Sequence, residues 1–86
     1  MITKRDRDKI KEIIPHYVEA VQAIMREKKI YNRRGLVYGP QIIRDVFNGR
    51  RSNPRIETAI YLAYYKMLDE LQTAKEAAKK IMDDEN

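Results

Sequence analysis

The sequence has 86 residues, with 18 Lys and Arg against 13 Asp and Glu, a formal net charge of +5, and no cysteine. One small domain is expected at this length, and 20 Leu, Ile, Val and Phe residues are just enough for a thin core. The lack of cysteine excludes disulfides, thiolate nucleophiles and Cys-type zinc sites, so we expect a cytoplasmic protein. The longest apolar run is residues 59–65, so neither a membrane span nor a signal peptide is expected.

The positive charge is concentrated in the middle third of the chain. Residues 26–55 hold nine basic and two acidic side chains, a net charge of +7, whereas residues 1–25 carry +1 and residues 56–86 carry −3. From Arg33 onward the basic residues of the middle segment are all arginine, whose planar guanidinium suits phosphate and guanine. This distribution is expected of a nucleic-acid surface, although a solvated basic loop region has the same composition.

Two amphipathic helices are predicted in the first third of the chain. Thr3 is a suitable N-cap with Asp6 three residues later, and Pro15 ends or kinks this helix near Ile14. In the next helix the apolar residues form one stripe, which consists of Tyr17, Val18, Val21, Ile24 and Met25. Each of the two helices therefore has one face to bury.

Residues 30–38, IYNRRGLVY, do not continue the helical pattern. The turn formers Asn32 and Gly35 lie between apolar and aromatic residues that favour extended backbone. We expect a turn or a very short hairpin that carries Arg33 and Arg34.

A short helix is predicted from Pro40, which suits a first helical turn, to about Asn48, because Gly49 suits the position after a helix end. Its apolar face consists of Ile42, Ile43, Val46 and Phe47, and its polar face of Gln41, Arg44, Asp45 and Asn48. A core can hold such a helix while the polar face meets a polar partner. An ordinary amphipathic surface helix has the same pattern, but here arginine flanks the helix on both sides.

The last predicted helix is the longest. Ser52 or Asn53 can cap it, and Pro54 falls in its first turn. Its apolar stripe consists of Ile56, Ile60, Ala63, Met67, Leu71, Ala74, Ala78 and Ile81. With no breaker before the acidic tail 83–86, the helix would reach about 28 residues and about 40 Å. Within one domain spanning 1–86, we expect residues 70–86 to be a helical extension that packs on another copy of the chain or frays.

The stretch 39–60, GPQIIRDVFNGRRSNPRIETAI, resembles the recognition helix and following turn of Cro/repressor-like helix-turn-helix DNA-binding proteins. The matching residues are Ile43, Val46, Asn48, Gly49, Arg50 and Arg51. The similarity covers about residues 17–65 and is to small single-domain proteins of bacteria or mobile elements. It implies an all-α, helix-turn-helix-like bundle of about four helices, with a short basic turn or hairpin before the recognition helix and a long C-terminal helix.

The segment 24–35, IMREKKIYNRRG, is also similar to the recombinase domain of large serine recombinases, where a helix, a basic turn and another helix engage DNA. The chain departs from the repressor pattern in one respect. The usual second helix is replaced by IYNRRGLVY, which we expect to act as a small basic wing on phosphates or in a narrow minor groove.

These residues predict sequence-specific binding of double-stranded DNA, in a transcriptional regulator or a mobile-element accessory protein. We expect Gln41 and Arg44 to read base edges, and Asp45 to accept from cytosine or to orient Arg44. Contacts to phosphates or a groove are expected from Arg33, Arg34, Tyr38, Asn48, Arg50, Arg51 and Asn53. Because one copy reads few base pairs, a homodimer through the last helix is expected.

The main alternative is a protein-interaction module, such as an antitoxin-like or assembly factor, that uses Tyr61, Tyr64 and Tyr65. RNA binding is a weaker possibility, because aromatic platforms alternating with basic groups are not evident. An enzyme is not expected, since His16 has no catalytic partners in the pattern and no phosphate loop is present. Likewise, no cofactor, metal ion, membrane or small-molecule substrate is expected.

Overall fold

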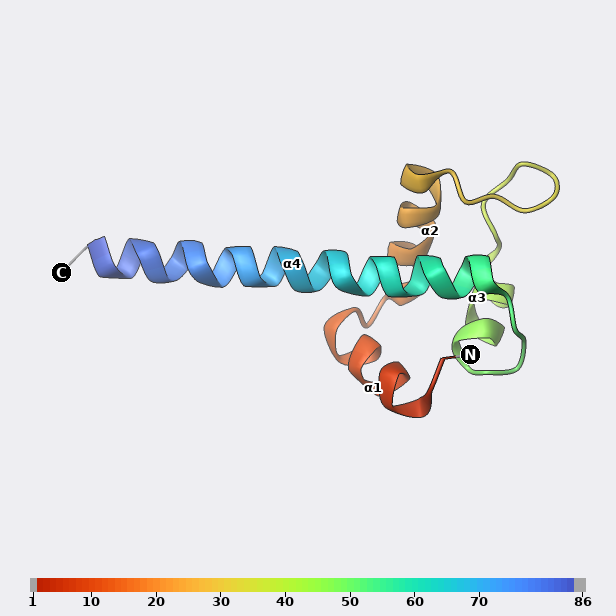
Figure 1. Cartoon of the computed structure of the whole chain (residues 1–86), viewed down its shortest axis with the longest axis horizontal. Coiled ribbons are helices and arrows are strands. Elements are labelled where there is room, and N and C mark those ends of the chain that lie inside the picture. The colour runs from red at the N-terminus through yellow and green to blue at the C-terminus, as the bar shows by residue number, and fades with distance from the viewer. Residues whose placement is uncertain (1, 85–86) are drawn as a thin grey trace.

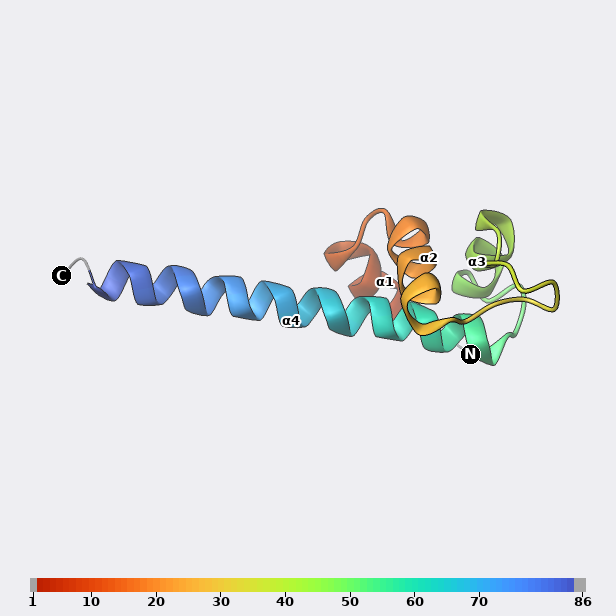
Figure 2. The same cartoon turned by 90° about the horizontal axis from the view of Figure 1, so that it is seen from above.

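The computed structural model describes residues 2–84 and contains four helices and no strand in that range. The helices are α1 (Lys4–Ile13), α2 (Tyr17–Lys28), α3 (Pro40–Phe47) and α4 (Pro54–Asp84). Helices α1, α2 and α3 gather around the N-terminal half of α4, and the rest of α4 extends away from them (Figures 1 and 2). The prediction of a small all-α bundle with a long C-terminal helix is therefore confirmed.

The helix ends follow local capping chemistry. The Thr3 hydroxyl accepts a hydrogen bond of 3.1 Å from the Asp6 N–H, as a capping residue should. Pro40 occupies the first turn of α3, and Gly49 after its end has a φ of 79°, which favours glycine. Asn53 was one of two expected caps of α4, and its Oδ1 accepts from the N–H groups of Arg55 and Ile56.

The core is formed by the apolar stripes of all four helices. Its fully buried side chains include Ile10, Val21, Met25, Ile43, Val46, Phe47, Ile56 and Ile60. The Tyr17 ring stacks on Phe47 with 4.0 Å between ring centroids, so the first turn of α2 is fixed against α3. This packing holds the short α3 by its apolar face and leaves its polar face outward.

Residues 30–38 form a turn and not a hairpin. The Asn32 N–H donates to the Leu36 carbonyl oxygen at 2.7 Å, and the Gly35 N–H donates to the Asn32 carbonyl oxygen at 3.0 Å. Gly35 has a φ of 75°, which a side chain would disfavour. The loop projects beyond the helices in both views (Figures 1 and 2).

Helix α4 is longer than predicted, with 31 residues. It continues through Asp84, so the part of the expected extension 70–86 that lies within the described residues is helical, including Asp83 and Asp84 of the acidic tail. The physical reason is that aspartate lowers helix propensity only slightly and does not stop a helix as proline does. Glu85 and Asn86 lie outside the described residues. No helix within residues 2–84 combines the length and apolar character needed to cross a bilayer.

Candidate nucleic-acid interface

The predicted site residues gather at one end of the molecule, which we call the basic end and define as residues 29–39, α3 and residues 48–53. This end lies opposite to the C-terminal end of α4 (Figure 1). The exposed predicted residues are Arg33, Arg34, Gln41, Arg44, Arg50 and Arg51, and the half-buried ones are Tyr38, Asp45, Asn48 and Asn53. The basic end holds Lys29 and five arginines against Asp45, a net charge of +5, and the fold places it away from the acidic C-terminal part of the chain.

The loop before α3 is fixed at its tip and at both of its ends. At the tip, Asn32 Oδ1 accepts from the N–H groups of Arg34 and Leu36, at 2.8 and 3.2 Å. The Arg55 guanidinium donates to the Tyr31 carbonyl oxygen at 3.2 Å, which joins the loop to α4. At the other end of the loop, Gln22 Nε2 of α2 donates to the carbonyl oxygen of Tyr38 at 3.1 Å.

A hollow of about 370 Å³ lies beside this loop. It is lined by Asn32, Arg33, Arg34, Tyr38 and Asn53. Four of these five were predicted to contact phosphate or a groove, and they come from two segments on either side of α3. The fold therefore brings the predicted wing and the turn after α3 to one concave, positively charged surface.

On the outer face of α3, Asp45 connects two of the predicted contact residues. Its Oδ1 accepts from Gln41 Nε2 at 3.1 Å and lies 3.7 Å from an Arg50 guanidinium nitrogen. The Arg50 and Arg51 N–H groups donate to its backbone carbonyl oxygen at 2.8 and 3.3 Å. Because the Asp45 side chain is only 19% exposed, it is suited to orienting Gln41 and Arg50. The structure therefore pairs Asp45 with Gln41 and Arg50, where the sequence suggested Arg44.

Arg44 lies at the flank of the polar face of α3, about 60° around the helix from Gln41 and beside the start of α2. It lines a hollow together with residues 15–19, which form the first turn of α2 and the two residues before it. Burial raises the pKa of Tyr17, and the nearby positive charge of Arg44 acts in the opposite direction. His16 precedes this helix without a side-chain capping bond. The start of α2, which was not among the predicted site residues, therefore belongs to the surface around Arg44. The only signal for it in the sequence is His16.

Asn48 and Asn53 hold the turn between α3 and α4. Asn48 Nδ2 donates to the Arg44 carbonyl oxygen at 2.9 Å, and Asn53 Oδ1 caps α4 as described above. These bonds fix the backbone that carries Arg50 and Arg51. Phosphate contact by the two asparagines stays a prediction.

Arg7 of α1 reaches the same turn and was not among the predicted residues. Its guanidinium donates to the Asn48 carbonyl oxygen at 3.4 Å, across 41 positions of sequence. This adds a half-buried positive charge behind the end of α3. No local pattern could have shown this contact, because it depends on how α1 packs.

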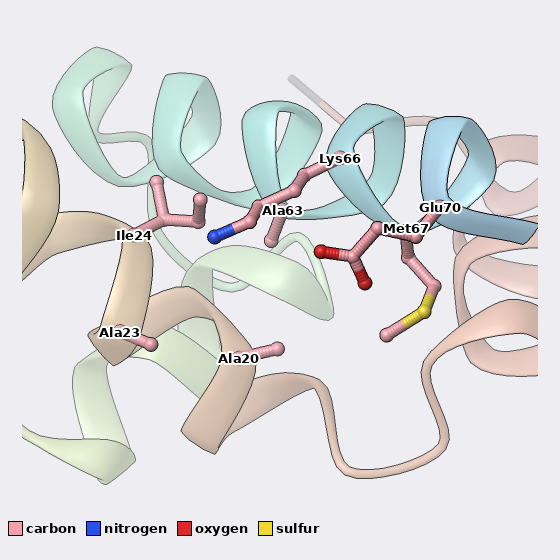
Figure 3. Close-up of a pocket in the computed structure, with 7 residues that line it drawn as sticks. All are labelled: Ala20, Ala23, Ile24, Ala63, Lys66, Met67 and Glu70. Carbon is pink, nitrogen blue, oxygen red and sulfur yellow. The ribbon is translucent and has the colours of Figure 1, made fainter. Parts of the chain in front are cut away.

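One of the other concavities is an apolar groove between α2 and α4 (Figure 3). It is lined by Ala20, Ala23, Ile24, Ala63 and Met67, with Lys66 and Glu70 on α4. Its volume is about 170 Å³, whereas ligand pockets generally begin at about 300 Å³. Within residues 2–84, no group of three His, Asp or Glu side chains is placed to hold a metal ion. The basic end combines a hollow of about 370 Å³ with clustered arginine, and it is therefore taken as the candidate site.

In comparisons with known proteins, no family model matches this chain, and neither a curated protein nor a solved structure shows significant similarity to it. The resemblance to Cro/repressor-like proteins therefore rests on the residues quoted above. The candidate site rests on the geometry and charge of the basic end.

Proposed function

We propose that the protein binds double-stranded DNA through the basic end, with sequence preference, as a transcriptional regulator or a mobile-element accessory protein. The observation that carries this proposal is the clustering of arginine at the basic end, around one short helix that Ile43, Val46 and Phe47 anchor in the core. A fixed helix with an exposed polar face and arginine on both sides suits the major groove, which admits an α-helix.

In this proposal α3 reads base edges. Gln41 and Arg44 are exposed and fall about 60° apart around the helix, so both can face one groove. Arg is suited to guanine O6 and N7, and Gln to adenine N6 and N7. The bond from Gln41 to Asp45 keeps the Gln41 amide near one orientation before DNA is met. Such pre-organisation lowers the entropic cost of ordering the Gln41 side chain on binding.

The flanking arginines contact the DNA backbone on both sides of α3. Arg33 and Arg34 are on a turn that four hydrogen bonds hold, and Arg50 and Arg51 are on a turn whose N–H groups bond to Asp45. Contacts of this kind fix the register of α3 and are insensitive to sequence. Tyr38, Asn48 and Asn53 lie beside them and complete the predicted contact set.

Replacing one base-reading residue and one residue that contacts the DNA backbone tests whether the two roles are separate. DNA sites are first selected from a random duplex pool, and then Arg44→Ala and Arg51→Ala proteins are measured on the selected site and on single-base variants. Arg44→Ala should cost about 1–3 kcal/mol and remove the preference at one base pair, whereas Arg51→Ala should weaken all sequences alike. Equal losses on every sequence for both variants would refute base reading by Arg44.

The proposal includes a homodimer formed by the α4 extension, residues 70–84. All side chains of residues 70–81 are exposed, and among them Leu71 and Ile81 are 40% and 62% exposed. They fall on one stripe with Ala74 and Ala78, at the spacing of three and four residues that a helix partner covers. A second copy supplies an identical stripe, which a two-fold dimer uses on both sides.

Sedimentation of a chain ending at Glu70 tests this interface. The full chain is expected to be a dimer and the shortened chain a monomer at the same concentration. Ala78→Lys should also give monomers, whereas Ala77→Lys, about 100° away around the helix, should affect dimerisation less. A shortened chain that remains dimeric would refute the assignment of the interface.

The second candidate function, a protein-interaction module, is favoured by one observation. Tyr65 is 60% exposed and its ring lies 5.5 Å from that of Tyr64, beside a hollow between α1 and α4. Tyr61 is less available, because its hydroxyl donates to Asp6 at 2.8 Å. Under this alternative the chain would bind DNA weakly or not at all, and Tyr65→Ala would abolish partner binding without affecting DNA.

A further inference from the structure

The basic end exposes one large apolar side chain, that of Leu36. Leu36 is 60% exposed, and the other large apolar side chains with comparable exposure in the described residues, Tyr65, Leu71 and Ile81, all belong to α4. Its neighbours in the loop behave differently, since Ile30 and Val37 pack against the core. The loop can therefore bury apolar groups, and yet it turns Leu36 away from the core.

The backbone of Leu36 is held in this position from both sides. Its N–H donates to Asn32 Oδ1 at 3.2 Å, and its carbonyl oxygen accepts from the Asn32 N–H at 2.7 Å. The preceding Gly35 has a φ of 75° and no heavy atom within 4 Å of where its Cβ would be. A turn that is closed by this many bonds around Leu36 presents the side chain as a fixed point and not as part of a disordered loop.

The surroundings of Leu36 are cationic. Arg33 and Arg34, three and two residues before it, are exposed on the same turn. The whole loop projects beyond the helices (Figures 1 and 2) and is tied to α4 through Arg55 and to α2 through Gln22. An apolar tip beside two arginines matches the narrow, negatively charged minor groove, where proteins insert leucine between base pairs and place arginine along the groove.

We propose that Leu36 is a DNA-intercalating wedge, which enters the minor groove beside Arg33 and Arg34, partly unstacks one base step and bends the DNA. This inference rests on the proposed function, because it needs DNA at the basic end. It adds a distinct role for Leu36. In this arrangement α3 lies in the major groove, and the loop that carries Leu36 deforms the adjacent minor groove. Sequence preference then comes partly from steps that kink easily, such as TA.

The test measures DNA shape as well as affinity. A duplex of about 40 base pairs with a central TA step is labelled at its two ends with a donor and acceptor pair, and energy transfer reports the bend. The full chain should bend this DNA by about 20–90°. Leu36→Ala should abolish most of the bend and weaken binding about tenfold. Tyr65→Ala, which removes an equally exposed side chain of α4 outside both the basic end and the α4 extension, should leave the bend unchanged.

The outcomes separate the two proposals. Because Leu36 is exposed, Leu36→Ala should retain the helical circular dichroism and melting temperature of the parent chain. If DNA is bound but Leu36→Ala bends it as the parent does, or if the parent does not bend it, the wedge is refuted while the proposed function stands. In that case the exposed Leu36 side chain would be assigned to contact with a protein. If the parent chain binds no DNA under any salt condition, the proposed function fails and the wedge fails with it.

Discussion

The basic end and the α4 extension both expose their side chains, but only the basic end is held by contacts from elsewhere in the fold. Its loop is tied to α2 and α4, its short helix is anchored by Ile43, Val46 and Phe47, and its last turn receives a bond from α1. The extension has helix-forming residues and an exposed apolar stripe, with all described side chains beyond Leu68 in solvent. The difference indicates that one region is pre-organised for a rigid ligand, while the other needs a partner to gain stability.

The largest expected effect compares two isoleucines of the same helix. Ile60 is fully buried, whereas Ile81 is 62% exposed. Ile60→Ala should lower the free energy of unfolding by about 2–5 kcal/mol, because it removes buried contacts and leaves a cavity. Ile81→Ala should change it by less than about 0.5 kcal/mol at concentrations where the chain is monomeric. Urea denaturation of both variants measures this, and equal losses would contradict the packing described here.

The second comparison removes one exposed positive charge from each region. Arg51→Ala at the basic end should weaken DNA binding by about 1 kcal/mol, whereas Lys79→Ala on the extension should leave the affinity nearly unchanged. Both side chains are exposed, so neither variant should affect folding. Fluorescence anisotropy on one duplex is sufficient. A larger loss from Lys79→Ala would place the DNA along α4 and not at the basic end.

A third variant loosens the loop without removing charge. Gly35→Ala should cost about 1 kcal/mol, because alanine disfavours the positive φ of 75° there. No steric clash is added, since the space around Gly35 is open. If the turn opens while the rest of the chain stays folded, the loss should appear in DNA affinity. If the turn opens only when the whole chain unfolds, the loss should appear in the free energy of unfolding. Gly39→Ala is a suitable control, because Gly39 has a negative φ of −72°. A Gly35→Ala protein with parental stability and affinity would show that the turn is not needed.

The smallest effect concerns the contact between α1 and α4. Burial and the hydrogen bond to Asp6 raise the pKa of Tyr61 to about 12, from an ordinary value of 10. The folded state thus retains this proton more tightly than the unfolded state. Its contribution to stability is complete below pH 10 and is lost as the pH rises from 10 to 12. Tyr61→Phe should remove this part of the alkaline destabilisation, and parallel pH profiles for the two proteins would contradict it.

Much of the fold follows from local sequence signals. Thr3, Pro40, Gly49 and Asn53 mark helix ends because capping involves only neighbouring residues. The apolar stripes predicted the core, since a helix can bury only one face. The length of α4 was underestimated by three residues, because the apolar stripe ends at Ile81 whereas the helix continues through Asp84.

The candidate site was only partly predictable. The residues of α3 and its flanking turns were found because charge and helical spacing are visible in the sequence. The hydrogen bonds from Arg7 to Asn48 and from Tyr61 to Asp6 were not predicted, since 41 and 55 positions separate the partners in sequence. The pairing of Asp45 with Gln41 and Arg50 depends on side-chain rotamers, which spacing alone does not determine.

The central claim is that the basic end binds the DNA backbone, and the salt dependence of binding tests it most directly. The association constant of the full chain for a duplex is measured at sodium chloride concentrations from roughly 50 to 300 mM. If Arg33, Arg34, Arg50 and Arg51 each contact a phosphate, a plot of log association constant against log salt should have a slope of about −3 to −4 per protomer. Replacing Arg33 and Arg34 together by alanine should reduce this slope by about 2. A slope near zero, or a slope unchanged in that variant, would contradict the account.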